Sequence, residues 1–156
     1  MSAVPDVAVI PGDDRPGPVL DLDNGPFFAG LRRHVVVVQE CDACGRRRFG
    51  RVGACPYCGA SGGTDVEVAG DGAIYSFVRV HRPLTPSMAD DVPYAVATVD
   101  LDAGVRMLGR VEPPEAAAIG VRVTALFVEH ADWTELRFAA GVAGGTAAEP
   151  GAPEPA

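Results

Sequence analysis

The sequence has no lysine, no long apolar run and no recognisable leader. All 13 basic residues are arginine, a bias that we attribute to a genome rich in G and C. No apolar stretch approaches the roughly 20 residues that a membrane helix needs, and the longest, 35–38, ends at Gln39. The N-terminus also lacks the basic start and apolar stretch of a secretory signal. We therefore expect a cytoplasmic protein with no membrane segment.

Positive charge and aromatic side chains are also scarce. The formal net charge is −8, and aromatic residues make up only 6% of the chain. A protein that follows a phosphate backbone usually carries a basic surface. The acidic total therefore argues against nucleic acid as the main partner.

Glycine and proline, by contrast, are abundant, with 19 and 14 copies in 156 residues. This composition favours short strands and many turns. Residues 1–26 hold five Pro and five Asp and predict a flexible N-terminal arm. Residues 141–156 predict a disordered, low-complexity tail. Between them we expect a helix plus ribbon at 27–68 and a barrel at 69–140.

The middle of the chain predicts one short helix and then a series of strands. Pro26 suits the first turn of a helix that covers 27 to about 33. The β-branched run at 35–39 suits a strand, and 64–68 alternates weakly. Period-two segments then follow at 74–81, 94–101, 105–111, 121–128 and 133–138, with room for one helical turn between the third and the fourth.

These five segments predict a mainly β protein whose last domain is a five-stranded OB-fold barrel. An open five-stranded sheet of another topology is the alternative, because periodicity alone does not separate the two. In the first segment Ile74 and Val78 are expected on one face. Tyr75, Phe77 and Arg79 are expected on the other.

Four cysteines, Cys41, Cys44, Cys55 and Cys58, follow the spacing C-x2-C-x10-C-x2-C. A glycine after each pair lets the backbone turn its amides toward sulfur. Two such knuckles present four thiolates to one tetrahedral zinc ion. With four protein ligands the shell is closed, so we expect one structural zinc ion. The alternatives are iron, as in rubredoxin, or a redox dithiol, although the usual βαβ surroundings are absent.

Several motifs together resemble a known family. They are F-F-A-G-L-R-R, C-D-A-C-G, C-P-Y-C-G, G-D-G-A-I-Y-S-F-V-R-V-H-R, D-V-P-Y-A-V-A-T-V-D-L-D and V-R-M-L-G-R-V-E, and they cover about residues 27–138. The chain resembles the acyl-CoA-associated proteins in which a rubredoxin-like zinc ribbon precedes an OB-fold. It departs from them at Phe28, where tryptophan is usual.

The resemblance implies an accessory subunit. Members pair with thiolase-like enzymes, steroid side-chain aldolases or C-acyltransferases, in lipid, steroid or polyketide-type acyl-CoA metabolism, and the partner carries the catalytic residues. The resemblance also implies a hetero-oligomer with a thiolase-like protein, and acyl-CoA as the ligand. No Ser/His/Asp or Cys/His spacing stands out, so we assign no catalytic residue and expect no enzyme activity from the chain alone.

Two groups of residues are candidate contacts to CoA or to a partner. Between residues 32 and 51 the sequence has six arginines and only two acidic residues. Guanidinium groups match the geometry of phosphate oxygens. This region is either a solvated basic face or a phosphate clamp. His81 is either a rim residue or a ligand contact. The candidates are Arg46, Arg47, Arg48, Arg79, His81 and Arg82.

Two other functions compete with the accessory subunit. An OB-fold that binds single-stranded nucleic acid would stack bases on Tyr75 and Phe77, but the acidic total opposes it. A stand-alone acyl-CoA carrier or thioesterase would need a nucleophile or a positioned carboxylate for hydrolysis, and the sequence indicates neither.

Overall fold

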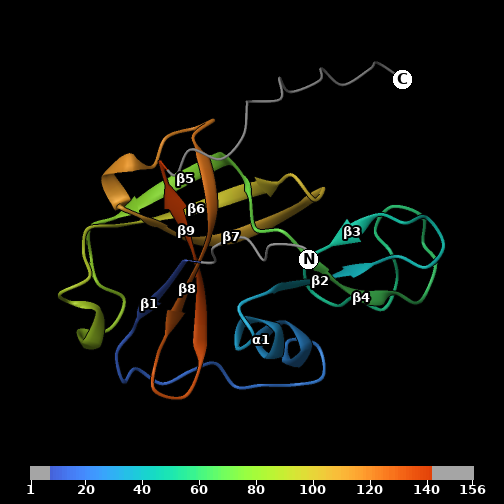
Figure 1. Cartoon of the computed structure of the whole chain (residues 1–156), viewed down its shortest axis with the longest axis horizontal. Helices are drawn as coiled ribbons and strands as arrows, with labels where there is room; N and C mark the ends of the chain where they lie inside the picture. The colour runs from blue at the N-terminus through green and yellow to red at the C-terminus, as the bar shows by residue number, and fades with distance from the viewer. Residues whose placement is uncertain (1–7, 142–156) are drawn as a thin grey trace, which may run out of the picture.

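The computed structural model describes residues 8–141, which form two sheets and one α-helix (Figure 1). Figure 1 shows the smaller sheet beside the barrel, with the helix between them. In chain order the elements are β1 (Ala8–Pro11), α1 (Gly25–Leu31), β2 (Val36–Glu40), β3 (Arg47–Arg48), β4 (Thr64–Val68), β5 (Gly72–Val80), η1 (Pro86–Met88), β6 (Tyr94–Leu101), β7 (Val105–Glu112), η2 (Pro114–Ala116), β8 (Arg122–Glu129) and β9 (Thr134–Ala140).

The larger sheet is an OB-fold barrel, as the strand pattern predicts. Its strands run in the order β5-β6-β7-β9-β8. The sheet closes because β8 pairs with β5 at Gly72↔Val123 and Ala73↔Arg122. The parallel contact of β7 with β9 completes the circuit. An open sheet is therefore excluded, and the 3₁₀ turn η2 occupies the expected place between β7 and β8.

A β-bulge in β5 overturns the expected division of its faces. The register with β6 shifts between Ile74 and Ser76, so one extra residue enters the strand and the alternation after it is inverted. Ile74 is buried, but Val78 is 61% exposed. Phe77 instead packs against the core. Tyr75 and Phe77 thus do not form a shared stacking surface.

The N-terminal segment is not a flexible arm over its described part. β1 pairs in parallel with β8, from Ala8↔Leu126 to Pro11↔Glu129. The Gly12 N–H donates to the carbonyl of Glu129 at 2.7 Å. β8 pairs with β5 only near the start of β8. The later half of β8 would otherwise have an unpaired edge, and β1 covers this edge. Residues 1–7 and 142–156, including nearly all of the expected tail, lie outside the described residues.

The smaller sheet has the order β3-β2-β4 and carries the cysteine knuckles at its end. Helix α1 packs on β2 with Leu31 fully buried. A Cβ at Gly30 would lie 2.4 Å from Cγ2 of Val37, so only glycine permits this approach. Val36, Val38 and Leu31 belong to the same apolar core as the barrel residues, which joins ribbon, helix and barrel. The boundary at 68/69 remains a prediction.

None of the helices within residues 8–141 has the length and apolar character needed to cross a membrane.

Candidate metal centre and neighbouring surfaces

The four cysteines converge at one point of the ribbon. Their Sγ atoms all lie within 4.8 Å of one another. Cys41 and Cys55 are buried, whereas Cys44 and Cys58 are exposed, and all four are free thiols. The Sγ atoms of Cys41 and Cys58 are 3.8 Å apart, as are those of Cys44 and Cys55.

These distances fit zinc. Four sulfurs placed about 2.3 Å from a tetrahedral ion are about 3.8 Å from one another. All four sulfurs converge on one point, whereas a redox dithiol needs only one pair of cysteines, so the arrangement is that of a metal centre. The chain therefore has a rubredoxin-like zinc ribbon with four cysteines clustered for one structural zinc ion.

The two knuckles turn the backbone toward sulfur in the same way. Gly45 has φ +70° and Gly59 has φ +75°, conformations that favour glycine. Gly45 N–H donates to the Cys41 carbonyl, and Gly59 N–H to that of Cys55, each at 2.9 Å. The amides of Cys44 and Ala43 donate to the Cys41 sulfur and lower the pKa of this thiol to about 6. They favour the thiolate that binds a metal.

Arg48 belongs to the interior of the ribbon and has no surface for a CoA phosphate. It is 5% exposed. Its Nε donates to Oε1 of Gln39 at 2.8 Å, and Nη2 donates to the carbonyl of Gly62 at 3.0 Å. Arg48 thus ties β2 to the loop before β4, and this burial removes it from the candidate contacts.

Arg46 and Arg47 line a polar cavity of about 420 Å³ between the ribbon and the β6–β7 turn. Arg47 donates to Glu40 at 2.9 Å and to the carbonyl of Ala103 at 3.0 Å. The Arg46 guanidinium carbon lies 4.8 Å from the ring centre of Tyr57, over its face. This side chain is exposed and is the one best placed to meet an anion.

The other three candidates lie elsewhere, at the end of β5. Arg79 donates to the carbonyls of Pro114, Glu115 and Ala117, so it holds η2 against the barrel. His81 and Arg82 are exposed beyond it. The predicted contacts therefore form two separate groups, and they do not converge on one site.

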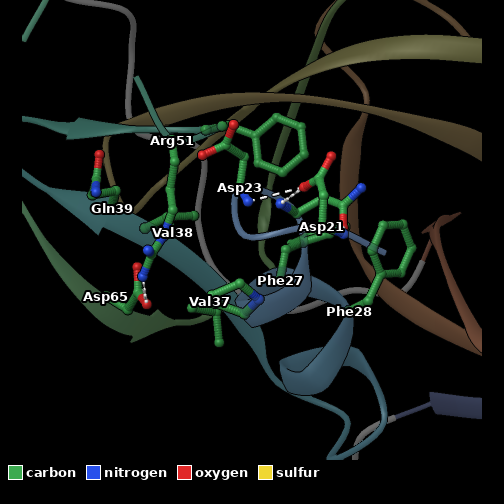
Figure 2. A pocket seen from close by; sticks show the side chains of 13 residues that line it. Asp21, Asp23, Phe27, Phe28, Val37, Val38, Gln39, Arg51 and Asp65 are labelled. Carbon is green, nitrogen blue, oxygen red and sulfur yellow. Dashed lines mark hydrogen bonds and ion pairs between the residues drawn. The ribbon is translucent and has the colours of Figure 1, made fainter. Parts of the chain in front are cut away.

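An apolar cavity of about 240 Å³ lies between α1 and the ribbon (Figure 2). Its walls include Phe27, Phe28, Val37, Val38 and Phe49. The ring centres of Phe27 and Phe49 are 4.9 Å apart in an edge-to-face arrangement.

Carboxylates stand at the edge of this cavity. Figure 2 shows Asp21 and Asp23 on the side of the loop before α1, and Asp65 with Arg51 on the ribbon side. Arg51 pairs with Asp65. The sequence predicts the helix but not this cavity, because the ribbon residues that close it come from elsewhere in the chain.

A buried histidine cluster was also missed. His130 directly follows β8, and its side chain is only 1% exposed. Its ring stacks on Trp133 with centres 4.5 Å apart. Nδ1 faces the Asp13 carboxylate at 2.9 Å and Nε2 faces Glu135 at 3.0 Å. Trp133 Nε1 donates to the carbonyl of Arg15, so this cluster fastens the N-terminal segment to the β8–β9 turn.

Family models match both halves of the described chain. Residues 28–63 match the rubredoxin-like zinc ribbon domain of ChsH2, and residues 65–128 match the C-terminal OB-fold domain of ChsH2. The two matches meet near the end of the ribbon, and together they include every cysteine and most of the barrel.

Three relatives are similar in sequence. The chain is 34% identical over 123 residues to a probable enoyl-CoA hydratase alpha subunit of Thermomonospora curvata, covering 78% of this chain and 36% of the relative. It is 33% identical over 132 residues to the 3-oxo-4,17-pregnadiene-20-carboxyl-CoA hydratase alpha subunit of Mycobacterium tuberculosis, covering 83% and 39%. The chain thus spans little more than a third of each of these two subunits.

The third relative is a DUF35 domain-containing scaffold protein of Methanothermobacter thermautotrophicus, 29% identical over 99 residues, with 62% of this chain and 74% of the relative covered. Among solved structures, a chain of an Ltp2-ChsH2(DUF35) aldolase matches with a TM-score of 0.69 and 31% identity, over 80% of this chain and 98% of that one. A DUF35 protein from Sulfolobus solfataricus, with a TM-score of 0.54 and 19% identity over 74% and 83%, shares the fold.

Proposed function

Because this chain belongs to the ChsH2-type, or DUF35, family of zinc-ribbon and OB-fold proteins, we propose that it is a non-catalytic accessory subunit of a thiolase-like enzyme acting on acyl-CoA. One observation carries the proposal. At 31% identity the chain covers 98% of the chain matched in the Ltp2-ChsH2(DUF35) aldolase.

The distribution of reactive groups supports a structural role for this chain. Its four thiols lie together in the zinc ribbon, where a closed shell leaves no position for substrate. His130 is enclosed between Asp13, Glu135 and Trp133. We therefore assign the bond-making groups to the partner. The ribbon holds the fold rigid, and the barrel helps to exclude water from the partner's reactive intermediate.

For the acyl-CoA itself we propose the polar cavity beside the ribbon as the site for the nucleotide end. Arg46 and Arg47 both line this cavity, and the Arg46 guanidinium lies over the face of the Tyr57 ring. A guanidinium binds phosphate oxygens in pairs, and an exposed tyrosine ring offers a face for adenine. Arg79, His81 and Arg82 remain candidate contacts for the partner or for the acyl arm.

The function is tested by co-expressing the chain with a thiolase-like protein of the same organism. We expect a stable hetero-oligomer in light scattering, acyl-CoA turnover by the complex, and none by the purified chain. Efficient turnover of a thioester by the isolated chain, abolished by changing one of its own residues, would overturn the proposal.

The nucleotide site is tested separately by Arg46→Glu, with Arg33→Glu as the matched charge reversal. Arg33 is exposed and pairs with Glu67 on another surface. We expect acyl-CoA affinity of the complex, measured by calorimetry, to fall about tenfold or more for Arg46→Glu only. Equal affinities of the two variants would remove the cavity as the phosphate site.

A further inference from the structure

We propose that the thiolase-like partner docks on an acid-rimmed apolar surface formed by α1, the segment before it and the ribbon loop after β3. This inference rests on the proposed function and adds the place and chemistry of the interface. The surface, here the α1 face, comprises Val19, Leu20, Leu22, Phe27 and Phe49. It selects a partner patch in which an apolar side chain is surrounded by arginine or lysine.

The segment before α1 and the loop after β3, which line one cavity, both carry exposed apolar side chains. Val19 and Leu22 are each 89% exposed, Leu20 is 57% exposed and Phe49 is 43% exposed. Exposed residues of this kind are ordinary when scattered singly, but a contiguous patch marks an interaction surface. Three of them stand within four residues of sequence, next to a cavity that is itself apolar.

The α1 face is also hollowed on both sides of Phe28. One hollow is the apolar cavity of Figure 2. The other, of about 260 Å³, is lined by Leu20, Phe28, Ala29 and Trp133 among others. Anchoring side chains at protein interfaces fill hollows of this sort, and such anchors provide most of the binding energy. Val19 and Leu22 belong to the segment that runs between the two.

The segment before α1 is held in place before any partner arrives. Oδ1 of Asp21 accepts hydrogen bonds from the backbone N–H groups of Asp23 and Asn24, at 2.9 and 2.8 Å. Asn24 in turn accepts from the Asp21 N–H and donates to the Val19 carbonyl. A surface that is already ordered loses less conformational entropy on binding than a flexible one. The apolar side chains are therefore presented in a fixed arrangement.

The charge around the cavity decides which occupant fits. Asp21, Asp23 and Asp65 line it, against one basic residue, Arg51. A second copy of this chain would bring the same carboxylates and a net charge of −8, so two α1 faces would repel each other. Nucleic acid is disfavoured by the same acids. A protein patch with basic side chains around an apolar centre is complementary to both features.

The test uses the co-expressed complex of the full chain with its thiolase-like partner. Leu22→Asp and Asp23→Arg alter the apolar and the acidic part of the α1 face. Ile119→Asp is the matched control, because Ile119 is 72% exposed and follows η2 on the barrel. All three positions are on the surface, so thermal melting of the isolated variants should match the wild type.

We expect Leu22→Asp to weaken the complex at least about tenfold and Asp23→Arg several-fold, with no change for Ile119→Asp. Hydrogen exchange should show protection of 18–28 in the complex. A complex that forms normally with Leu22→Asp would overturn this interface and leave the proposed function standing. A wild-type chain that binds no thiolase-like protein would overturn both. A homodimer broken by Leu22→Asp would identify a second copy as the occupant and also overturn the inference.

Discussion

Cys41 and Cys55 are the buried half of the cluster, each 2% exposed. The other two cysteines face solvent. A thiol among four convergent sulfurs contributes little packing compared with what a bound metal supplies, since zinc binding in such sites is coupled to folding and is worth about 10–16 kcal/mol. The stability of the ribbon therefore depends on each sulfur separately.

Replacing Cys55 by alanine should abolish stable zinc binding and unfold the ribbon before any effect on partner activity is visible. The physical reason is that three ligands leave an incomplete shell. The measurements are metal content and thermal melting. Tyr57→Ala, at a 55% exposed position of the same knuckle, should keep its metal. A Cys55→Ala protein that stays folded and metal-loaded would contradict the structural role of the ion.

Helix α1 is held against β2 by the absence of a side chain at Gly30. A Cβ there would lie 2.4 Å from Cγ2 of Val37 and 3.1 Å from the Val35 carbonyl oxygen. Valine is stiff at χ1, so it does not easily turn aside. The same contact positions Phe27 and Phe28, and with them the apolar cavity.

Gly30→Ala should therefore lower the free energy of unfolding by about 1–3 kcal/mol, as overpacking usually does. Gly25→Ala is the matched control, because a Cβ at this position in the first turn meets nothing within 4 Å. It should change stability by less than about 0.5 kcal/mol or raise it slightly. Denaturant unfolding of both variants provides the measurement. Equal stability of the two variants would mean that α1 moves away from β2 at little cost.

A set of ion pairs links distant parts of the sequence within the barrel domain and the segment before α1. Arg15 pairs with Asp91, which also binds Arg110. Glu135 lies between His130 and Arg137. Burial raises the pKa of Glu135, but the hydrogen bonds from Arg137 and His130 outweigh this effect, so its pKa lies below the usual value. Arg15 and Arg110 likewise lower the pKa of Asp91.

Acid should consequently destabilise the whole barrel. A carboxyl whose pKa is lower in the folded protein adds stability above its unfolded pKa, which is about 4.5 for Glu135, and this contribution disappears as the pH falls through the folded value. We expect the urea concentration at the midpoint of unfolding to be lower at pH 3 than at pH 6.

Glu135→Gln should be less stable at pH 7 by about 1–3 kcal/mol, with a shallower loss in acid. Glu115→Gln, at an exposed position, should follow the wild type. Parallel pH profiles of wild type and Glu135→Gln would show that this carboxyl does not contribute to the acid sensitivity.

Local pattern determined the zinc ribbon and the strands of the barrel. The cysteine spacing and the glycine after each pair specify a knuckle within five residues, and alternation predicted Thr64–Val68 and Tyr94–Leu101 with the bounds observed. The number and order of these segments predicted an OB-fold barrel or an open five-stranded sheet, and the pairing of β8 with β5 decided for the barrel. Such features depend on neighbours in sequence, so they can be read from it directly.

Only the tertiary structure decided what β1, His130, Arg48 and the β5 bulge do. β1 is a strand because β8 leaves an edge open more than a hundred residues later. His130 is buried because Asp13 and Trp133 enclose it. The bulge turns Phe77 inward through its register with β6. Each depends on contacts between segments far apart in the chain, and no local pattern of residues encodes such contacts.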